Sequence, residues 1–92
     1  MTSRHVRVGE EIKREVSSII ATEVKDPRLG MLSITDVDVS RDLSFAKVYF
    51  SMLGTEEERE KTLEGLNRAK GFIRSELAKR LRLRHTPEVT FH

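Results

Sequence analysis

The sequence contains no cysteine among its 92 residues. This absence excludes disulfide bonds, a thiol nucleophile and a thiolate metal site, and it suits a reducing compartment. The sequence also has no apolar run near the roughly 20 residues that a membrane span requires, and residues 1–14 are too polar for a signal peptide. We therefore expect a protein without a membrane segment.

Motifs of catalysis and metal binding are missing as well. No phosphate-binding glycine loop or nucleophile elbow is present. Three histidines lack the spacing of metal ligands: His5, His85 and His92. Asp36, Asp38 and Asp42 suggest a metal or acid–base cluster, but a hard cation needs about six oxygen ligands, which no neighbouring loop supplies. We interpret these aspartates as solvated strand-edge charges and predict no metal, no cofactor and no enzymatic activity. A carboxylate-dependent nuclease is kept as a rival, marked by RNA cleavage that Asp38→Asn would abolish.

Basic charge, in contrast, is concentrated in one stretch. Residues 68–85 hold one carboxylate, Glu76, and seven basic side chains: Arg68, Lys70, Arg74, Lys79, Arg80, Arg82 and Arg84. The whole chain has a net charge of only +2, and residues 55–64 carry five glutamates against two basic residues. Such asymmetry predicts a polyanionic partner on one face of the protein.

The first half of the chain reads as a helix followed by a hairpin. Apolar residues at helical spacing predict a helix over residues 5–24, stopped by Asp26-Pro27 and followed by a turn at residues 28–30. Gly9 lies within this helix where a better helix former is expected. Apolar alternation predicts strands over 32–39 and 46–52, and a change of phase predicts a bulge near Thr35-Asp36. A turn at residues 40–42 joins them as an antiparallel hairpin.

The second half reads as helix, break, helix and strand. Thr55 with Glu58 three residues later fits a capping box, and the helix that follows runs from residue 56 to about 68. We expect a break or bend at Ala69-Lys70-Gly71, a second helical segment over about 72–83, and a last strand with Val89 and Phe91 inward. That strand can pair in parallel. The order predicts one α+β two-layer domain over residues 1–92, a three-stranded sheet with its helices on one face.

The same order is the type II KH topology, and three stretches match one family. They are residues 25–29 (KDPRL), residues 40–49 with SRDL leading into AKVY, and residues 69–88 with AKGFIRSEL, RLRLR and TPE. On these residues the chain resembles the bacterial ribosome-binding factor A family over essentially its full length. The resemblance implies a KH-like domain whose glycine-rich loop is replaced by a helix–kink–helix. Its alanine–any–glycine kink would be Ala69-Lys70-Gly71.

The resemblance also implies a function. Members of the family are small cytoplasmic factors that bind the small (30S) ribosomal subunit and its 16S rRNA, and they assist late maturation and 5′-end processing of that RNA. The family is associated with growth in the cold. A ribosome-assembly GTPase is a candidate further partner, and we expect a monomer away from the ribosome. Many members carry a C-terminal extension, and we expect it to be absent or removed here, because the chain stops at His92.

The candidate RNA contacts are the seven basic residues listed above, with the small residues of the kink letting the backbone approach a phosphate. A second basic group lies in the first helix, and we hold it equally as a further RNA contact or as an ordinary exposed helix end: Arg4, Arg7, Lys13 and Arg14. Phe72 is the one aromatic residue near the kink, and we expect it in the core more than on a stacking surface. The alternative function is a protein-interaction module or dimer that uses the Val8/Ile12 helix face or the open strand edge.

Overall fold

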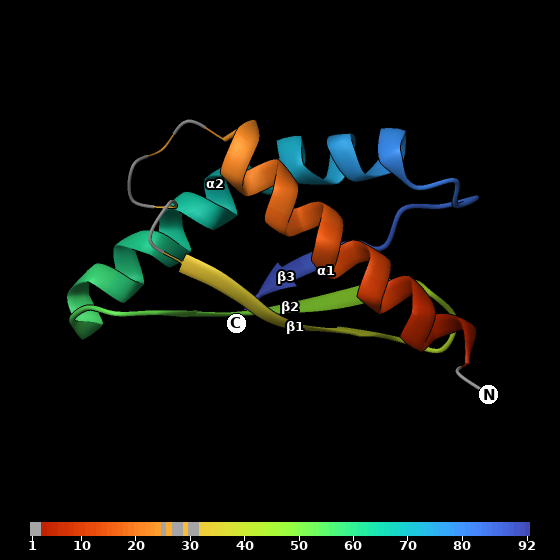
Figure 1. Ribbon diagram of the computed structural model, residues 1–92, viewed down its shortest axis with the longest axis horizontal. Helices are drawn as coiled ribbons and strands as arrows, with labels where there is room; N and C mark the ends of the chain where they lie inside the picture. The colour runs from red at the N-terminus through yellow and green to blue at the C-terminus, as the bar shows by residue number, and fades with distance from the viewer. Residues whose placement is uncertain (1–2, 25, 27–28, 30–31) are drawn as a thin grey trace.

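The protein forms a helix-covered sheet in the computed structural model, which describes residues 3–24, 26, 29 and 32–92 (Figure 1). The elements follow the order α1 (Arg4–Thr22), β1 (Leu32–Val39), β2 (Phe45–Met52), α2 (Glu56–Arg80) and β3 (Glu88–Phe91). The turn predicted at residues 28–30 includes residues 28 and 30, which lie outside the described residues, and so does Pro27. Helix α1 ends two residues earlier than predicted, where the N–H groups of Glu23 and Val24 both donate to the Ile19 carbonyl.

The sheet has the strand order β1-β2-β3. Strands β1 and β2 pair antiparallel, and β3 pairs parallel to β2, as the sequence predicts. The register shifts between Ile34 and Asp36, so the extra residue Thr35 forms the expected bulge. The bulge lets Ile34 and Val37 both turn toward the helices, which is why the apolar alternation changes phase at this point.

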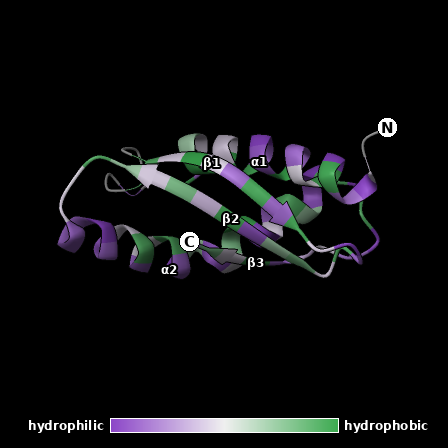
Figure 2. Ribbon diagram, turned by 90° about the horizontal axis from the view of Figure 1, so that it is seen from below, coloured by the Kyte–Doolittle hydropathy of each residue, from purple (hydrophilic) through white to green (hydrophobic). Residues whose placement is uncertain are grey.

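Both helices lie on one face of the sheet, and the core fills the space between the two layers (Figure 1). Ile12, Val16 and Ile19 of α1 are fully buried, and so are Val48 and Val89 beneath them. Seen from the uncovered face of the sheet, the strands show the alternation of apolar and polar residues along their length (Figure 2). Val8 and Ile12 belong to this core, so the part of the rival hypothesis that used their helix face for dimerisation is wrong.

Gly9 marks the place where α1 crosses closest to β1. A Cβ added at Gly9 would lie 3.0 Å from the backbone oxygen of Val37 and 3.4 Å from a methyl group of Val39. A backbone oxygen held in a paired strand cannot move aside cheaply, so a larger residue would require α1 or β1 to shift by a few tenths of an ångström. The glycine that is unfavourable for helix propensity is therefore required by packing.

Helix α2 is one continuous helix of 25 residues. The Thr55 hydroxyl accepts a hydrogen bond from the Glu58 N–H at 3.1 Å, which confirms the predicted cap. The helix runs without interruption through Ala69-Lys70-Gly71, so of the predicted alternatives, a break or a bend, the break is wrong. The helix axis does change direction part-way along (Figure 1). A bent helix keeps its backbone hydrogen bonds, and a packed stripe of Leu66, Ile73 and Leu77 holds it on the sheet. It ends at Arg80, three residues before the predicted end.

The β1–β2 turn is held by side chains within it. The Ser40 hydroxyl donates to Asp42 at 2.8 Å and accepts from the Phe45 N–H at 3.0 Å. The Asp42 carboxylate also accepts from the Ser44 N–H. Leu43 adopts a positive φ of 63°, a conformation that costs a residue with a side chain about 1 kcal/mol.

Candidate nucleic-acid interface

The predicted basic stretch lies on the second half of α2 and on the loop that follows it. Arg68, Arg74 and Lys79 are exposed on α2, and Lys70 is half-buried there. Arg82 and Arg84 are exposed in the loop between α2 and β3, and His85 is exposed beside them. The acidic residues Glu56–Glu58 stand at the opposite end of the same helix, so the charge asymmetry of the sequence becomes a separation in space.

Arg80 does not share this exposure. Its Nη1 atom donates to Glu15 Oε2 at 3.1 Å and to the Ser18 hydroxyl at 3.2 Å, and its Nη2 atom lies 3.9 Å from Glu23 Oε1. The side chains of Arg80 and Glu15 are each 27% exposed. Arg80 therefore joins the end of α2 to α1, and its charge is already neutralised by α1 carboxylates.

Arg74 and Lys79 also have partners within the chain, but both remain accessible. Arg74 donates to the Thr86 carbonyl at 3.1 Å and lies 3.5 Å from the Glu88 carboxylate. These contacts fix the loop after α2 against the helix. Lys79 pairs with Glu76 at 3.3 Å across one helical turn, and its side chain stays 74% exposed. Such a surface pair contributes well under about 1 kcal/mol and leaves the ammonium free to contact a ligand.

The three residues predicted as a kink have different surroundings. Ala69 packs against the core, Lys70 is half-buried, and Gly71 is exposed. A Cβ added at Gly71 would have no atom within 4 Å apart from its chain neighbours and the helix backbone. Packing in the described structure therefore gives no reason for a glycine here, in contrast to Gly9. The absent side chain leaves bare backbone on the outer surface of α2.

Phe72 is the aromatic residue that the sequence analysis placed in the core, and that interpretation is wrong. The residue is 46% exposed. At 100° per residue, Phe72 lies within about 40° of Arg68 and Lys79 on the helical wheel, so an aromatic ring sits between two cations on one exposed stripe. The apolar spacing of α2 could have shown this, because Ile73 and Leu77 already complete the buried stripe.

The structure brings Arg4 of the second basic group beside part of the first group at one end of the molecule. A cleft of about 380 Å³ lies where the start of α1, the β1–β2 turn and the α2–β3 loop meet. Arg4 lines it from α1, Arg74 from α2, and Arg84 with His85 from the loop. All three segments lie at the same end in Figure 1. A second hollow of about 440 Å³ adjoins it and is lined by Gly71, Arg74 and Arg84 among others.

The other members of the second basic group lie along α1. Arg7, Lys13 and Arg14 are exposed. Lys13 borders a separate hollow of about 560 Å³ together with Asp36 and Asp38. This hollow carries opposite charges side by side, so it is a poorer place for a polyanion than the Arg4 cleft.

The three aspartates do not share one role. Asp36 accepts a hydrogen bond from the Val37 N–H at 2.9 Å next to the bulge, whereas Asp42 holds the β1–β2 turn. Hydrogen bonds from Ser40 and from the Ser44 backbone and side chain lower the pKa of Asp42 below its ordinary value. Within the described ranges, no three His, Asp or Glu side chains are placed to hold a metal ion.

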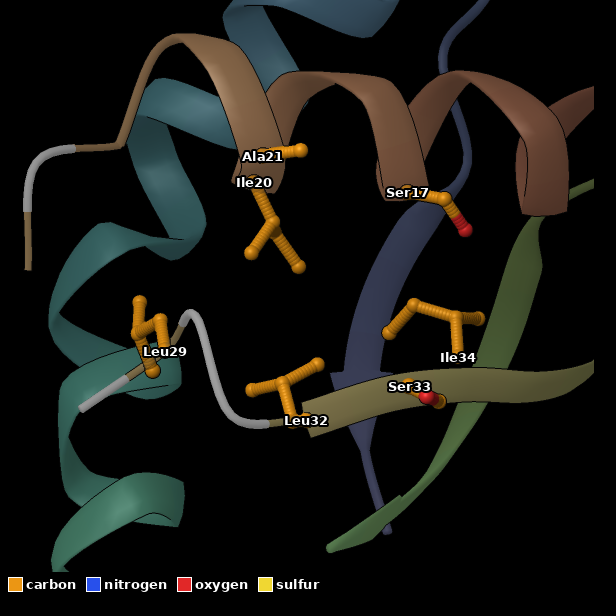
Figure 3. Close-up of a pocket in the computed structure, with 7 residues that line it drawn as sticks. All are labelled: Ser17, Ile20, Ala21, Leu29, Leu32, Ser33 and Ile34. Atoms are coloured by element: carbon orange, nitrogen blue, oxygen red, sulfur yellow. The ribbon is translucent and has the colours of Figure 1, made fainter. Parts of the chain in front are cut away.

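A fourth hollow is apolar and lies between α1 and β1 (Figure 3). Its volume is about 350 Å³, and Ile20, Leu29, Leu32 and Ile34 point into it, with two serines at its rim. No charged side chain lines it, so it cannot hold a phosphate.

In the part of the chain that the structure describes, neither helix is long and apolar enough to cross a bilayer.

The fold and sequence match those of known proteins. The family model described as ribosome-binding factor A matches residues 4–92. A crystal structure of ribosome-binding factor A from Thermus thermophilus superimposes with a TM-score of 0.85 at 31% identity, covering 96% of this chain and 93% of that one. A solution NMR structure from Thermotoga maritima, of a protein proposed to be a ribosome binding factor A, gives a TM-score of 0.82 at 42% identity, with 94% and 82% covered.

A third match is a homology model of the Thermus thermophilus ribosome binding factor A, fitted into a cryo-EM map of a complex of that factor with 30S. It gives a TM-score of 0.77 at 31% identity over 95% of this chain and 91% of that chain. These likenesses cover 82% or more of each chain and confirm the predicted α+β fold, with which a KH-like topology is consistent. The chain belongs to the ribosome-binding factor A family.

Proposed function

We propose that this ribosome-binding factor binds the 30S subunit through its 16S rRNA, using the exposed basic face of α2 and the loop after it. The observation that carries the proposal is the concentration of five basic side chains on the second half of α2 and on the loop after it, four of them exposed and Lys70 half-buried: Arg68, Lys70, Lys79, Arg82 and Arg84. We call these five the basic face. A related protein from Thermus thermophilus has been fitted into a map of its 30S complex, which supports the same partner here.

Two of the seven predicted contacts take other roles in this proposal. Arg80 is bound by Glu15 and Ser18, so a phosphate would have to displace partners that the fold supplies. Arg74 holds the loop through Thr86 and Glu88, and it contributes its remaining exposed donors at the edge of the basic face. Both residues position the surface, and the other five cations, four of them exposed and Lys70 half-buried, carry most of the contact with phosphates.

Phosphate contacts would supply affinity without reading sequence. The bare backbone at Gly71 lets an RNA strand approach the helix closely, since a Cβ there would project into open space. Phe72 offers a ring on which one unpaired base can stack between Arg68 and Lys79. The combination fits a site for RNA shape with one splayed nucleotide, rather than for a long sequence.

The bound factor would assist maturation of the small subunit without catalysing a reaction. A bound factor that neutralises phosphates can stabilise one local arrangement of the rRNA during late maturation, including the form whose 5′ end is processed. Such help is needed most in the cold, where wrong RNA pairings persist longest, and it would take place in the cytoplasm. A ribosome-assembly GTPase is the proposed agent of release, and the free factor is proposed to be a monomer.

The test is co-sedimentation with isolated 30S subunits over a salt series. The variant is Arg68→Ala/Arg82→Ala, and the matched control Arg59→Ala/Lys61→Ala removes the same charge at the other end of α2. We expect saturable binding to 30S but not to 50S subunits, weakened by salt and at least 10-fold by the first variant only. Equal weakening by both variants would mean that only net charge matters. Salt-insensitive binding to a protein partner would favour the interaction-module alternative instead.

A further inference from the structure

The cleft at the end of the molecule joins residues 80 positions apart in the chain. Arg4 opens α1, and Arg84 lies in the α2–β3 loop, yet both line the same cleft of about 380 Å³. Neither residue has an ion-pair partner among the described residues. Two unpaired guanidinium groups facing one small cleft repel each other unless an anion lies between them.

The remaining charges of the cleft are partly cancelled. Arg74 and Glu88 both line it, and they face each other at 3.5 Å. That leaves Arg4 and Arg84 against one carboxylate, Asp42, whose pKa is lowered by hydrogen bonds from Ser40 and Ser44, so it stays ionised near neutral pH. The net charge of the lining is +1 with His85 neutral, which suits a single phosphodiester and not a larger cluster of anions.

The wall of the cleft contains the one residue other than glycine that has a positive φ in the described structure. Leu43, at φ 63°, lies in the β1–β2 turn between Asp42 and Ser44, which also line the cleft. Backbone strain of this kind persists where the surroundings hold it in place, and it gathers at binding sites. Leu43 lines none of the other three hollows described above, and its position at this cleft is independent of the charge argument.

We infer that the cleft holds one phosphodiester of the RNA strand, bridged by Arg4 and Arg84. This inference rests on the proposed function and extends it, because it makes Arg4 a direct contact and carries the RNA footprint from the basic face around the end of the molecule to α1. The bidentate geometry of a guanidinium suits a phosphate on each side.

A bridged phosphate has a signature that separate contacts lack. Each phosphate neutralised contributes close to 1 to the slope of log K against log salt. Arg4→Ala and Arg84→Ala should each weaken 30S binding about 5- to 10-fold. The double variant should lose little more than either single one, and its salt slope should fall by about 1 and not by 2.

Asp42→Asn supplies a test of opposite sign. An asparagine oxygen can still accept from Ser40 and Ser44, so the turn is kept while the negative charge is removed from the cleft. We expect this variant to bind 30S subunits about 2- to 3-fold more tightly at low salt. Lys61→Ala, at the far end of α2, should change neither affinity nor slope.

The experiment is co-sedimentation with 30S subunits over a salt series for these five variants and the wild type, with circular dichroism to confirm that each is folded. Additive losses with a slope change of 2, or wild-type binding by both single variants, would overturn the bridged phosphate while the wild type still binds. Weaker binding by Asp42→Asn would overturn it as well. Failure of the wild-type protein to bind 30S subunits would instead overturn the proposed function, and the inference with it.

Discussion

The guanidinium group of Arg80 lies 3.1 Å from the Glu15 carboxylate, across an interface formed by residues 65 positions apart. The pair is only about one quarter exposed, at 27% for each side chain. This pair attaches the basic end of α2 to α1. Arg80 therefore has a structural role, whereas its basic neighbours are the proposed RNA contacts.

Arg80→Ala should lower stability and leave the RNA contacts in place. Loss of a half-buried pair with its hydrogen bonds should reduce the free energy of unfolding by about 1–2 kcal/mol, measured by urea denaturation. Lys79→Ala, which removes a 74% exposed partner of Glu76, should change it by less than about 0.5 kcal/mol. If Arg80→Ala unfolds like the wild type but binds 30S subunits more weakly, Arg80 is an RNA contact after all.

Gly9→Ala should destabilise the protein, although alanine is the better helix former. The new Cβ would lie 3.0 Å from the Val37 backbone oxygen. We expect overpacking to cost about 1–3 kcal/mol, against a gain of about 1 kcal/mol in helix propensity. The measurement is the urea midpoint, and a midpoint at or above that of the wild type would contradict the close crossing of α1 over β1.

Gly71→Ala should have the opposite effect, because its Cβ would project into open space. We expect a gain of about 0.5–1 kcal/mol in the free energy of unfolding. Gly71→Val should leave the protein folded and weaken 30S binding, since its branched side chain covers the bare backbone. A Gly71→Val protein that is stable and binds normally would show that no strand approaches the helix there.

Phe72→Ala should separate a stacking role from a core role. A ring that is 46% exposed contributes little to the core, so the cost to stability should be under about 1 kcal/mol, whereas loss of one stacked base costs about 1–3 kcal/mol of binding. Phe72→Tyr should restore binding. The reverse pattern, in which stability falls by several kcal/mol and binding by folded protein is unchanged, would place the ring in the core.

Acid should weaken the β1–β2 turn through Asp42. Its pKa in the folded protein is lowered by hydrogen bonds from Ser40 and Ser44. A folded pKa below the unfolded one stabilises the protein at any pH above the unfolded value, and that stabilisation is lost as the pH falls through the folded pKa. Stability measured between about pH 5 and 2 should therefore decline less steeply in Asp42→Asn. Identical acid profiles for the two proteins would contradict the hydrogen-bond account.

Local rules were enough to predict most of the fold. The phase change between Ile34 and Val37 predicts the bulge because each strand residue must choose one face. Thr55 and Glu58 predict the start of α2 because they lie within hydrogen-bonding reach. The sequence left open whether α2 breaks or bends at Ala69-Lys70-Gly71, because glycine is unfavourable inside a helix. Packing of the helix on the sheet, which local propensity does not include, keeps α2 continuous.

The parts of the site that were missed depend on contacts between distant residues. The partner of Arg80 lies on α1, far away in the sequence. The sequence alone therefore does not distinguish Arg80 from Arg82 and Arg84, which belong to the same basic stretch. The need for Gly9 comes from a strand that follows it by 28 residues, at Val37. The meeting of Arg4 with Arg84 requires the full topology, since only the parallel placement of β3 brings the preceding loop beside the start of α1.

The unbroken course of α2 has a consequence for how the protein meets its target. A helix of 25 residues is about 37 Å long along its bent axis, and the longest extent of the molecule is 39 Å. With glutamates at one end and arginines at the other, it forms a permanent electric dipole along the long axis. In the field of a polyanion this dipole experiences a torque that turns the arginine end forward before contact, and the glutamate end is repelled. The orientation in which the protein approaches the polyanion is then set in solution, before any specific contact has formed.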